Sequence, residues 1–277
     1  MKNESSIQYK SLLEAGKPPI SFSPCYVQPG CQLYNEDCLK TMQGIETGSV
    51  DLILQDPPYN TTACEWEYAI DFETLWKEWV RIGKENCTYI FTTAQPFTTD
   101  VVMSNRKMFK YETIWMKSNV TGFLSAAKKP LRQHENILLF CNGNETYNPQ
   151  MFMKATSRAA QKTVNANGVY GNIGEGIFRV AKDEEGFPRS VINFNTAYHE
   201  RNAGLHPTQK GLALFRYLVK TYSNEDDLVF DGYSGSATTA AACIKEKRRF
   251  IGSELSKEYF DKSVKRLELL RSQPELF

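Results

Sequence analysis

An acid, two prolines and an aromatic residue stand together at Asp56-Pro57-Pro58-Tyr59, one residue after the apolar run at 50–54. Proline restricts φ and lacks an N–H, so two in succession form a rigid turn whose carbonyl oxygens are free to accept hydrogen bonds. The amino group of a base could donate to the Asp56 carboxylate and the Pro57 carbonyl while the Tyr59 ring stacks on the base. These residues predict a slot for an aromatic amine. A strand-ending turn without a ligand is the alternative, because Asp-Pro and Pro-Pro pairs are common in loops.

A second loop rich in small residues, Asp231-Gly-Tyr-Ser-Gly-Ser-Ala-Thr-Thr239, follows the apolar run at 227–230 and precedes an alanine-rich segment. Small residues allow a ligand to approach the backbone, and a helix N-terminus offers free N–H groups to a carboxylate. The glycine spacing does not match G-x-G-x-x-G, which disfavours an oxidoreductase that binds a pyrophosphate. Glu254 follows the next predicted strand, where an acid can pair with ribose hydroxyls. The loop therefore predicts a nucleoside site, with a turn needed only for helix packing as the alternative.

Alternating apolar patterns supply the elements that must position these loops. Strands are predicted over 50–54, 88–91, 227–230 and 249–252, and helices over 72–82, 211–222, 237–245 and 258–270. In the helix over 72–82 we expect Leu75, Trp76, Trp79 and Val80 to face inward. Such alternation predicts an α/β fold with a doubly wound, mostly parallel sheet. The two loops then share one crevice if their strands are neighbours at the switch point.

The chain divides into four predicted segments: an N-terminal extension at 1–29, a first half of the α/β domain at 30–140, an irregular insertion at 141–205 and a second half at 206–277. The insertion is rich in Gly, Asn and Thr, which is typical of loops. Between positions 128 and 162 there are six basic residues and two acidic ones, and this local excess of positive charge suits backbone phosphates. A solvated charged face is the alternative. The six are Lys128, Lys129, Arg132, Lys154, Arg158 and Lys162.

Composition excludes several classes of protein. Lys and Arg number 33 against 32 Asp and Glu, so no basic field covers the whole chain. The apolar runs are too short to span a membrane and the N-terminus has no hydrophobic signal region, so we expect a soluble, cytoplasmic protein. The seven cysteines contain no C-x-x-C pair and the three histidines are scattered, so neither a disulfide framework nor a metal site is predicted.

A third motif, His206-Pro207-Thr208-Gln209-Lys210, precedes the small-residue loop. The three motifs together resemble the amino DNA methyltransferases that use S-adenosylmethionine, and their order is similar to the β group of that family. The resemblance covers residues 30–270. It implies a methyltransferase (Rossmann-like) sheet, double-stranded DNA as substrate, base flipping, a restriction–modification setting in a prokaryotic or phage-infected cell and, as in many β-group relatives, a homodimer. The insertion at 141–205 would then recognise the target sequence.

The resemblance also implies a role for each matching residue. Asp56, Pro57, Pro58 and Tyr59 would bind the target amino group and stack on the flipped base. Asp37 and Cys38 would lie near the cofactor's adenine, Glu254 at its ribose, and the segment 206–210 near its methionine end. The full set implied at the cofactor is Asp37, Cys38, His206, Thr208, Gln209, Lys210, Asp231, Gly232, Tyr233, Ser234, Gly235, Ser236, Ala237, Thr238 and Glu254.

The chemistry expected at Asp56 is direct displacement. The lone pair of the amino nitrogen is delocalised into the base and must be freed. Hydrogen bonds from the amino group to Asp56 and the Pro57 carbonyl favour a tetrahedral nitrogen and stabilise its developing positive charge. No covalent intermediate is required.

The sequence departs from the family at four positions. Where relatives usually read D-P-F-x-G-S-G-T-T, this chain has Gly232 for Pro, Tyr233 for Phe and Ala237 for Gly, and Gly211 replaces a Pro after the H-P-T-Q-K motif. We expect Gly232 to loosen a turn that proline would hold, with weaker cofactor affinity as one consequence.

Alternative functions stay open. Adenine-N6 methylation is favoured because an acid begins the Asp-Pro-Pro-Tyr motif, whereas cytosine-N4 relatives more often carry Ser there. Methylation of RNA or a protein amide is disfavoured because those relatives usually read N-P-P-Y, and a cytosine-C5 mechanism through Cys25 is disfavoured because Pro24-Cys25 precedes the first core strand. A DNA-binding protein that has lost catalysis is a further alternative, motivated by Gly232 and Ala237.

Overall fold

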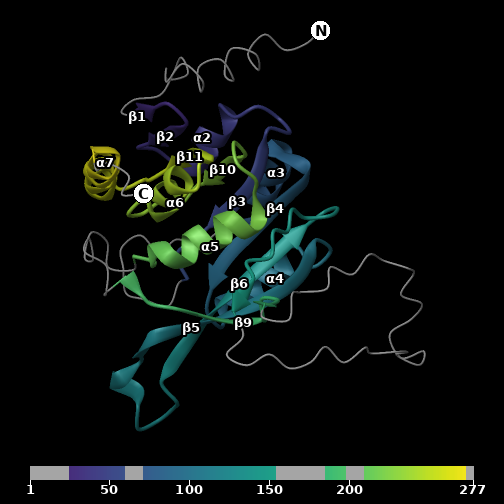
Figure 1. Cartoon of the computed structure of the whole chain (residues 1–277), viewed down its shortest axis with the longest axis vertical. Helices are drawn as coiled ribbons and strands as arrows, with labels where there is room; N and C mark the ends of the chain where they lie inside the picture. Colours follow the sequence, from purple (N-terminus) through teal and green to yellow (C-terminus); the bar gives the residue numbers. More distant parts are fainter. Residues whose placement is uncertain (1–24, 60–70, 154–184, 198–208, 273–277) are drawn as a thin grey trace, which may run out of the picture. The chain divides into compact units, whose positions relative to one another are not determined.

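A nine-stranded mixed sheet carries both loops at neighbouring strand ends (Figure 1). The computed structural model describes residues 25–59, 71–153, 185–197 and 209–272. The sheet order is β1-β2-β11-β10-β3-β4-β6-β5-β9. Its strands are β1 Cys25–Gln28, β2 Cys31–Tyr34, β3 Val50–Gln55, β4 Gly83–Thr93, β5 Phe109–Thr121, β6 Arg132–Cys141, β9 Val191–Phe194, β10 Leu228–Asp231 and β11 Arg249–Ser253.

The central strands are parallel. Ladders β2–β11, β11–β10, β10–β3 and β3–β4 all run in this sense, as does β5–β9 at the far edge, while β1–β2, β4–β6 and β6–β5 are antiparallel. The predicted doubly wound, mostly parallel fold is therefore confirmed. Strand β3 pairs with β10 through Leu52–Val229 and Ile53–Phe230, so the carboxyl ends that carry Asp56 and Asp231 are adjacent. This is the switch point at which such sheets bind ligands.

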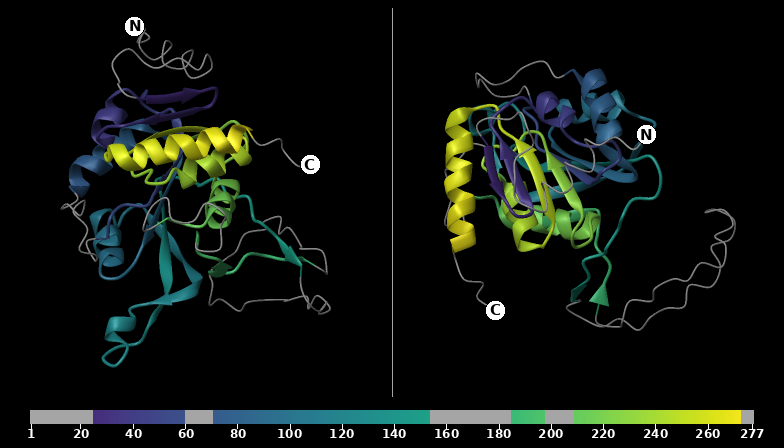
Figure 2. Two further views of the ribbon diagram at one scale, coloured as in Figure 1. Left: turned by 90° about the vertical axis from the view of Figure 1, so that its left-hand side faces the viewer. Right: turned by 90° about the horizontal axis from the view of Figure 1, so that it is seen from above.

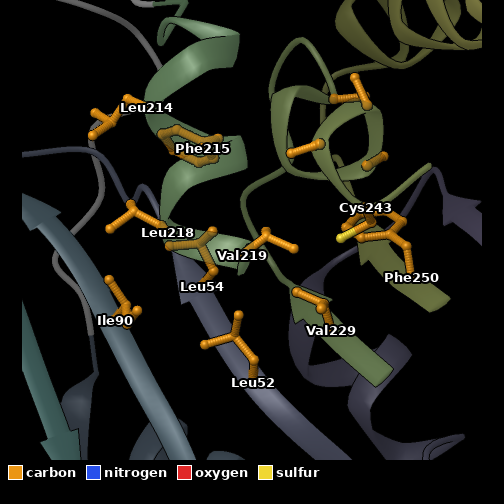
Figure 3. Close-up of a cluster of buried hydrophobic side chains, with 14 of the residues drawn as sticks. Leu52, Leu54, Ile90, Leu214, Phe215, Leu218, Val219, Val229, Cys243 and Phe250 are labelled. Atoms are coloured by element: carbon orange, nitrogen blue, oxygen red, sulfur yellow. The ribbon is translucent and has the colours of Figure 1, made fainter. Parts of the chain in front are cut away.

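Helices cover both faces of the sheet (Figure 2). Successive side chains of a strand point to opposite faces. In β3, Leu52 and Leu54 therefore join the cluster beneath α5, whereas Ile53 joins the cluster beneath α3. Figure 3 shows Leu52 and Leu54 facing Leu218 and Val219 of α5. The helices are α2 Cys38–Gln43, α3 Phe72–Ile82, α4 Phe97–Ser104, α5 Leu212–Tyr222, α6 Thr238–Lys245 and α7 Lys257–Ser272, with a 3₁₀ turn η1 at Phe123–Ser125.

Every predicted strand and helix is present, with bounds shifted by a few residues, but one predicted inward side chain is wrong. Val80 of α3 is 48% exposed, and Ile82 is buried in its place. Because successive residues of a helix are rotated by about 100°, Val80 lies beyond the edge of the stripe formed by Leu75, Trp79 and Ile82. The helix begins where the Asp71 side chain accepts a hydrogen bond from the Thr74 N–H.

The chain forms two compact units, Met1–Asn148 with Ser190–Phe277, and Pro149–Arg189. The smaller unit falls inside the predicted insertion at 141–205, while Val191–Phe194 of that range forms edge strand β9 of the large sheet. Within the smaller unit the described residues pair β7 Phe152–Met153 with β8 Glu185–Gly186. Lys154, Arg158, Lys162, His206 and Thr208 lie outside the described residues.

Two further features concern membrane-spanning helices and metal ligands. None of the helices that the described residues form is long and apolar enough to cross a membrane. Across 25–59, 71–153, 185–197 and 209–272, no group of three or more His, Cys, Asp or Glu side chains is arranged to hold a metal ion.

Candidate active site

Asp56 lies at the centre of a hydrogen-bonded cluster at the end of β3. Its carboxylate accepts a hydrogen bond from the Tyr59 hydroxyl at 2.9 Å and another from the Thr92 hydroxyl. The Lys210 ammonium donates to both carboxylate oxygens, at 2.7 and 2.8 Å. The structure therefore places the H-P-T-Q-K lysine directly on the acid of the Asp-Pro-Pro-Tyr motif.

Tyr59 forms the aromatic wall of the same cluster. Its ring stacks on Phe97, the first residue of α4, with centroids 5.7 Å apart and planes inclined by 23°. The Lys210 ammonium lies 5.1 Å from the centroid of the Tyr59 ring. Burial, together with the charges of Asp56 and Glu135, raises the pKa of Tyr59 well above its ordinary value, so its hydroxyl remains a neutral donor.

A second carboxylate, Glu135 of β6, completes the cluster. Its Oε1 accepts from Lys117 of β5 at 3.1 Å, and its Oε2 lies 3.3 Å from the Tyr59 hydroxyl and 3.7 Å from the Lys210 ammonium. Burial acts to raise the pKa of Glu135, but the Lys210 and Lys117 ammonium groups hold it below the ordinary value. The negative charges of Asp56 and Glu135 are thus balanced by the positive charges of Lys117 and Lys210 in a largely buried site.

Sequence reasoning missed Thr92, Lys117 and Glu135 as site residues. In the sequence, Glu135 is one of the two acidic residues that offset the basic excess between positions 128 and 162. The available signal was local: Thr92 and Glu135 are polar residues bordering the apolar runs of β4 and β6. A polar residue at the end of a buried strand marks a site only when a neighbouring strand brings a partner to it, as β3 brings Asp56 to Thr92.

The small-residue loop surrounds the buried carboxylate of Asp231. Asp231 accepts hydrogen bonds from the Tyr233 N–H at 2.9 Å and from the Thr239 hydroxyl. Burial raises the pKa of Asp231 from 3.8 to about 7 despite these donors, and the nearby charges of Asp56 and Glu254 act in the same direction. Glu254 accepts from the Gly235 and Ser256 N–H groups, both at 2.8 Å. The loop therefore gathers acids that a positively charged ligand would stabilise in the ionised form.

Arg266 of α7 stabilises the 231–238 loop through hydrogen bonds. Its guanidinium donates to the Ser236 carbonyl at 2.7 Å and to the Thr238 hydroxyl at 3.0 Å, and the Ser234 hydroxyl donates to the Asp231 carbonyl at 3.1 Å. Ala237, where relatives usually have Gly, has φ +56°. This left-handed conformation favours glycine and explains the family pattern. No local pattern around Arg266 predicts this role.

Gln55 links the two strand ends, a connection that the sequence analysis did not foresee. Its amide donates to the Phe230 carbonyl at 3.1 Å, and its Oε1 accepts the Gly232 N–H at 3.1 Å. A Cβ at position 232 would lie 2.8 Å from the Cβ of Cys38. The turn that proline would hold by its ring is therefore held here by Gln55, and α2 packs where that ring would lie.

Gly232→Pro, although it restores the usual family residue, is therefore expected to destabilise this protein by about 1–3 kcal/mol and to weaken binding at the loop. Proline removes the N–H that Gln55 accepts and adds atoms against Cys38. Chemical denaturation measures the change. Gly211→Pro is the matched control, because φ of −66° at Gly211 already suits a proline ring. Equal stability of the two variants would contradict this account of the turn.

The structure places the predicted residues at several separate positions of the fold. Asp56, Tyr59 and Lys210 meet in one cluster, and the 231–238 loop and Glu254 form the adjoining one. Asp37 caps the N-terminus of α2 by accepting from the Leu39 N–H at 2.8 Å, and Cys38 lies against Gly232. Lys128, Lys129 and Arg132 are exposed on the β5–β6 hairpin. Cys25 lies in β1, which three intervening strands separate from β3. Burial and, to a smaller extent, the charge of Glu36 raise the pKa of the Cys25 thiol, which does not suit a nucleophile.

Comparison with known proteins identifies the family to which the chain belongs. The sequence profile of the N6/N4 DNA methylase family matches residues 50–265, which include both clusters. The chain belongs to this DNA methylase family. It is an S-adenosylmethionine-dependent amino DNA methyltransferase, as the three motifs implied.

Individual relatives agree with this assignment. The DNA methylase is 28% identical to the DNA adenine methyltransferase YhdJ of Escherichia coli over 258 residues, covering 84% of this chain and 81% of the relative. It is 26% identical to the type II methyltransferase M.HpaI of Haemophilus parainfluenzae over 249 residues, covering 86% and 74% of the two chains.

Two solved structures share the fold of the DNA methylase. The M1.HpyAVI–SAM complex matches with a TM-score of 0.59 at 22% identity, over 86% of this chain and 98% of that one. The cytosine-N4-specific PvuII DNA methyltransferase matches with a TM-score of 0.61 at 14% identity, over 89% and 88% of the two chains.

The residues of this DNA methylase fit the cofactor of the family. Both polar atoms of the Gln209 side-chain amide are buried and have no hydrogen-bond partner among the described residues, which is costly unless a ligand supplies one. The acids Asp231 and Glu254 lie beside a glycine-containing loop that leads into α6. S-adenosylmethionine offers matching groups: a sulfonium, an ammonium, a carboxylate and ribose hydroxyls.

Cofactor binding to this DNA methylase should weaken as the pH falls through about 7. The cofactor carries a net positive charge, so it binds best when Asp231 is ionised. Because the pKa of Asp231 in the free protein is about 7, protons compete increasingly below that pH, with a loss of affinity of up to about tenfold per pH unit. Calorimetry between pH 6 and 8.5 at constant ionic strength measures this. Asp231→Asn should flatten the profile, and a flat profile in the wild type would contradict the assignment.

Proposed function

We propose that the protein methylates the exocyclic N6 amino group of adenine in double-stranded DNA. The observation that carries the proposal is the Asp56 cluster, in which one carboxylate already holds a nitrogen donor through two hydrogen bonds next to the Tyr59 ring. A flipped adenine offers the same two features, an amine and a flat ring. The acid at position 56 and the relative named as a DNA adenine methyltransferase favour adenine over cytosine.

The residues of the cluster would act on the amino group. Asp56 and the Pro57 carbonyl accept its two hydrogens, which turns the nitrogen lone pair away from the ring and stabilises the positive charge that develops on nitrogen. Thr92 and Tyr59 hold the carboxylate in place. S-adenosylmethionine, when bound, supplies the methyl group from a sulfonium. Once the nitrogen is methylated it carries a surplus proton, and Asp56 is the adjacent base that accepts it.

The adjoining cluster would hold the cofactor. Asp231 and Gln209 would bind its methionine end, Glu254 its ribose, and Asp37 and Cys38 would border its adenine. Glu254 now accepts two backbone N–H groups. A carboxylate has lone pairs left for ribose hydroxyls after two such bonds, so the cofactor need not displace them.

Analysis of the methylated nucleosides tests the proposal. Unmethylated genomic DNA is incubated with the protein and S-adenosylmethionine labelled in the methyl group, then digested to nucleosides. The proposal expects label in N6-methyldeoxyadenosine. Label in N4-methyldeoxycytidine would contradict adenine specificity, and cofactor binding without labelled DNA would contradict the DNA substrate and favour a scaffold that has lost catalysis.

The β5–β6 hairpin is the proposed contact with DNA backbone phosphates. It extends from the sheet (Figure 1) and carries Lys128, Lys129 and Arg132 exposed near its end. Its base holds Lys117 and Glu135 of the active site. Phosphates bound along the hairpin would therefore lie close to Lys117 and Glu135, the residues by which the hairpin contributes to the Asp56 cluster.

Replacing Lys128, Lys129 and Arg132 with glutamine should reduce the salt dependence of DNA binding. Each phosphate contact contributes about 0.9 to the slope of log K against log salt, so the slope should fall by about 2–3 units. Titrations at several salt concentrations measure it. The control replaces three lysines of α7, Lys257, Lys262 and Lys265, with glutamine. A slope that changes equally in both variants would contradict a specific role for the hairpin.

Further parts of the proposal concern the setting of the reaction. The segment at 141–205, with Lys154, Arg158 and Lys162, would recognise the target sequence. A homodimer would bring two such regions to one duplex. Because the proposed substrate is cellular DNA, we expect the protein to act in the bacterial cytoplasm, including that of a phage-infected cell.

A further inference from the structure

Lys210 occupies the place that the proposed function assigns to the target amine. Its ammonium donates to both oxygens of Asp56, at 2.7 and 2.8 Å, and lies 5.1 Å from the centre of the Tyr59 ring. The side chain is 9% exposed, so these contacts are made out of water. A base amine that engages Asp56 must therefore replace an ammonium group that is already bound there.

The same contact opposes the chemistry. Asp56 stabilises the positive charge that develops on the target nitrogen only to the extent that its own negative charge is available. While Lys210 donates to both oxygens, that charge is already compensated. The Lys210 ammonium must therefore leave Asp56 before methyl transfer. Because an unpaired charge is costly in a buried site, the ammonium needs another ionic partner.

Glu135 supplies the alternative partner. Its Oε2 lies 3.7 Å from the Lys210 ammonium, so a small movement brings the two into hydrogen-bond contact. The other oxygen, Oε1, is held at 3.1 Å by Lys117, which fixes the carboxylate in place. Across 25–59, 71–153, 185–197 and 209–272, the ion pairs of Lys210 are those with Asp56 and Glu135.

We propose, on the basis of the proposed function, that Lys210 is a positioning residue that closes Asp56 in the free enzyme and moves to Glu135 when the target amine enters. No covalent bond changes in this step. Before it, Lys210 neutralises Asp56; after it, Lys210 and Lys117 share Glu135, and Asp56 faces the amine with its full charge. A base without an amino group offers Asp56 no hydrogens to replace those of Lys210, so it would not open the site.

The contribution of the target amine to DNA binding tests this exchange. The probe is a pair of duplexes that carry the recognition sequence obtained from the methylated products, one with adenine at the target and one with purine, which lacks the amino group. Both are bound with S-adenosylhomocysteine present. The ratio of their dissociation constants, purine over adenine, reports the contact between amine and Asp56, and changes common to both duplexes cancel.

Glu135→Gln should lower this ratio by about 10- to 100-fold, the worth of a hydrogen bond to a charged group, because Lys210 then has no ionic partner other than Asp56. Adding Lys210→Gln in the double variant should restore the ratio to within about threefold of the wild type, since nothing then closes Asp56. The control is Glu112→Gln, which alters a carboxylate of β5 that accepts from Asn136 and should leave the ratio unchanged. Thermal unfolding confirms that each variant is folded.

Two results would overturn the exchange while leaving the function standing: a wild-type ratio in Glu135→Gln, or a double variant as low as Glu135→Gln alone. If the products show N4-methylcytosine, the same comparison is made with cytosine and 2-pyrimidinone at the target. If the wild type methylates neither base in DNA, the proposed function fails and this inference with it.

Discussion

Asp56→Ala is expected to lower methyl transfer by at least about a thousandfold while the dissociation constant of the cofactor stays within about threefold of the wild type. The substitution removes the group that accepts the target amine and leaves the Asp231 loop untouched. Single-turnover transfer to genomic DNA and calorimetry with S-adenosylmethionine measure the two effects separately.

Asp51→Ala is the matched control for that variant. Asp51 lies in β3, the strand that Asp56 follows, pairs with Lys84 and accepts from the Leu228 N–H at 2.9 Å, but it takes no part in either cluster. Its loss should affect stability and spare methyl transfer. Turnover near the wild-type level in Asp56→Ala would refute the assignment of Asp56.

Asp231→Ala should produce the opposite division, with cofactor binding weakened by about 10- to 100-fold and methyl transfer largely recovered at saturating cofactor. The carboxylate anchors the loop through Tyr233 and Thr239 and offers the negative charge that a sulfonium or ammonium seeks. Calorimetry gives the dissociation constant.

Asp227→Ala is the corresponding control, because Asp227 borders the other end of β10 and accepts from the Asn224 N–H at 2.7 Å. An unchanged dissociation constant in Asp231→Ala would count against the cofactor site. Equal losses in Asp227→Ala and Asp231→Ala would show that the effect comes from β10 as a whole.

Local patterns were sufficient for the elements that position the site. The helix over 72–82 follows from apolar spacing, and β3 and β10 follow from short apolar runs close to Asp56 and Asp231. The adjacency of Asp56 and Asp231 was expected only on the condition that their strands are neighbours, and the pairing of β3 with β10 meets that condition. Val80 was placed wrongly because periodicity alone does not fix the width of a buried stripe.

Contacts between distant segments could not be predicted from local patterns. Lys210 meets Asp56 across 154 positions, and Gln55 meets Gly232 across 177. The long β5–β6 hairpin, which carries Lys117 and Glu135, depends on the pairing of two strands whose register no short motif reveals. The family motifs named Asp56 and Lys210 separately, and only the three-dimensional arrangement shows that one neutralises the other.

The measurement that tests the account most directly is single-molecule mapping of modified bases in unmethylated genomic DNA after incubation with the protein and S-adenosylmethionine. The account predicts N6-methyladenine at one short sequence motif with the wild-type protein and none with Asp56→Ala. N6-methyladenine at the same motif with Asp56→Ala, or DNA that stays unmodified by a wild-type protein that binds the cofactor, would contradict it.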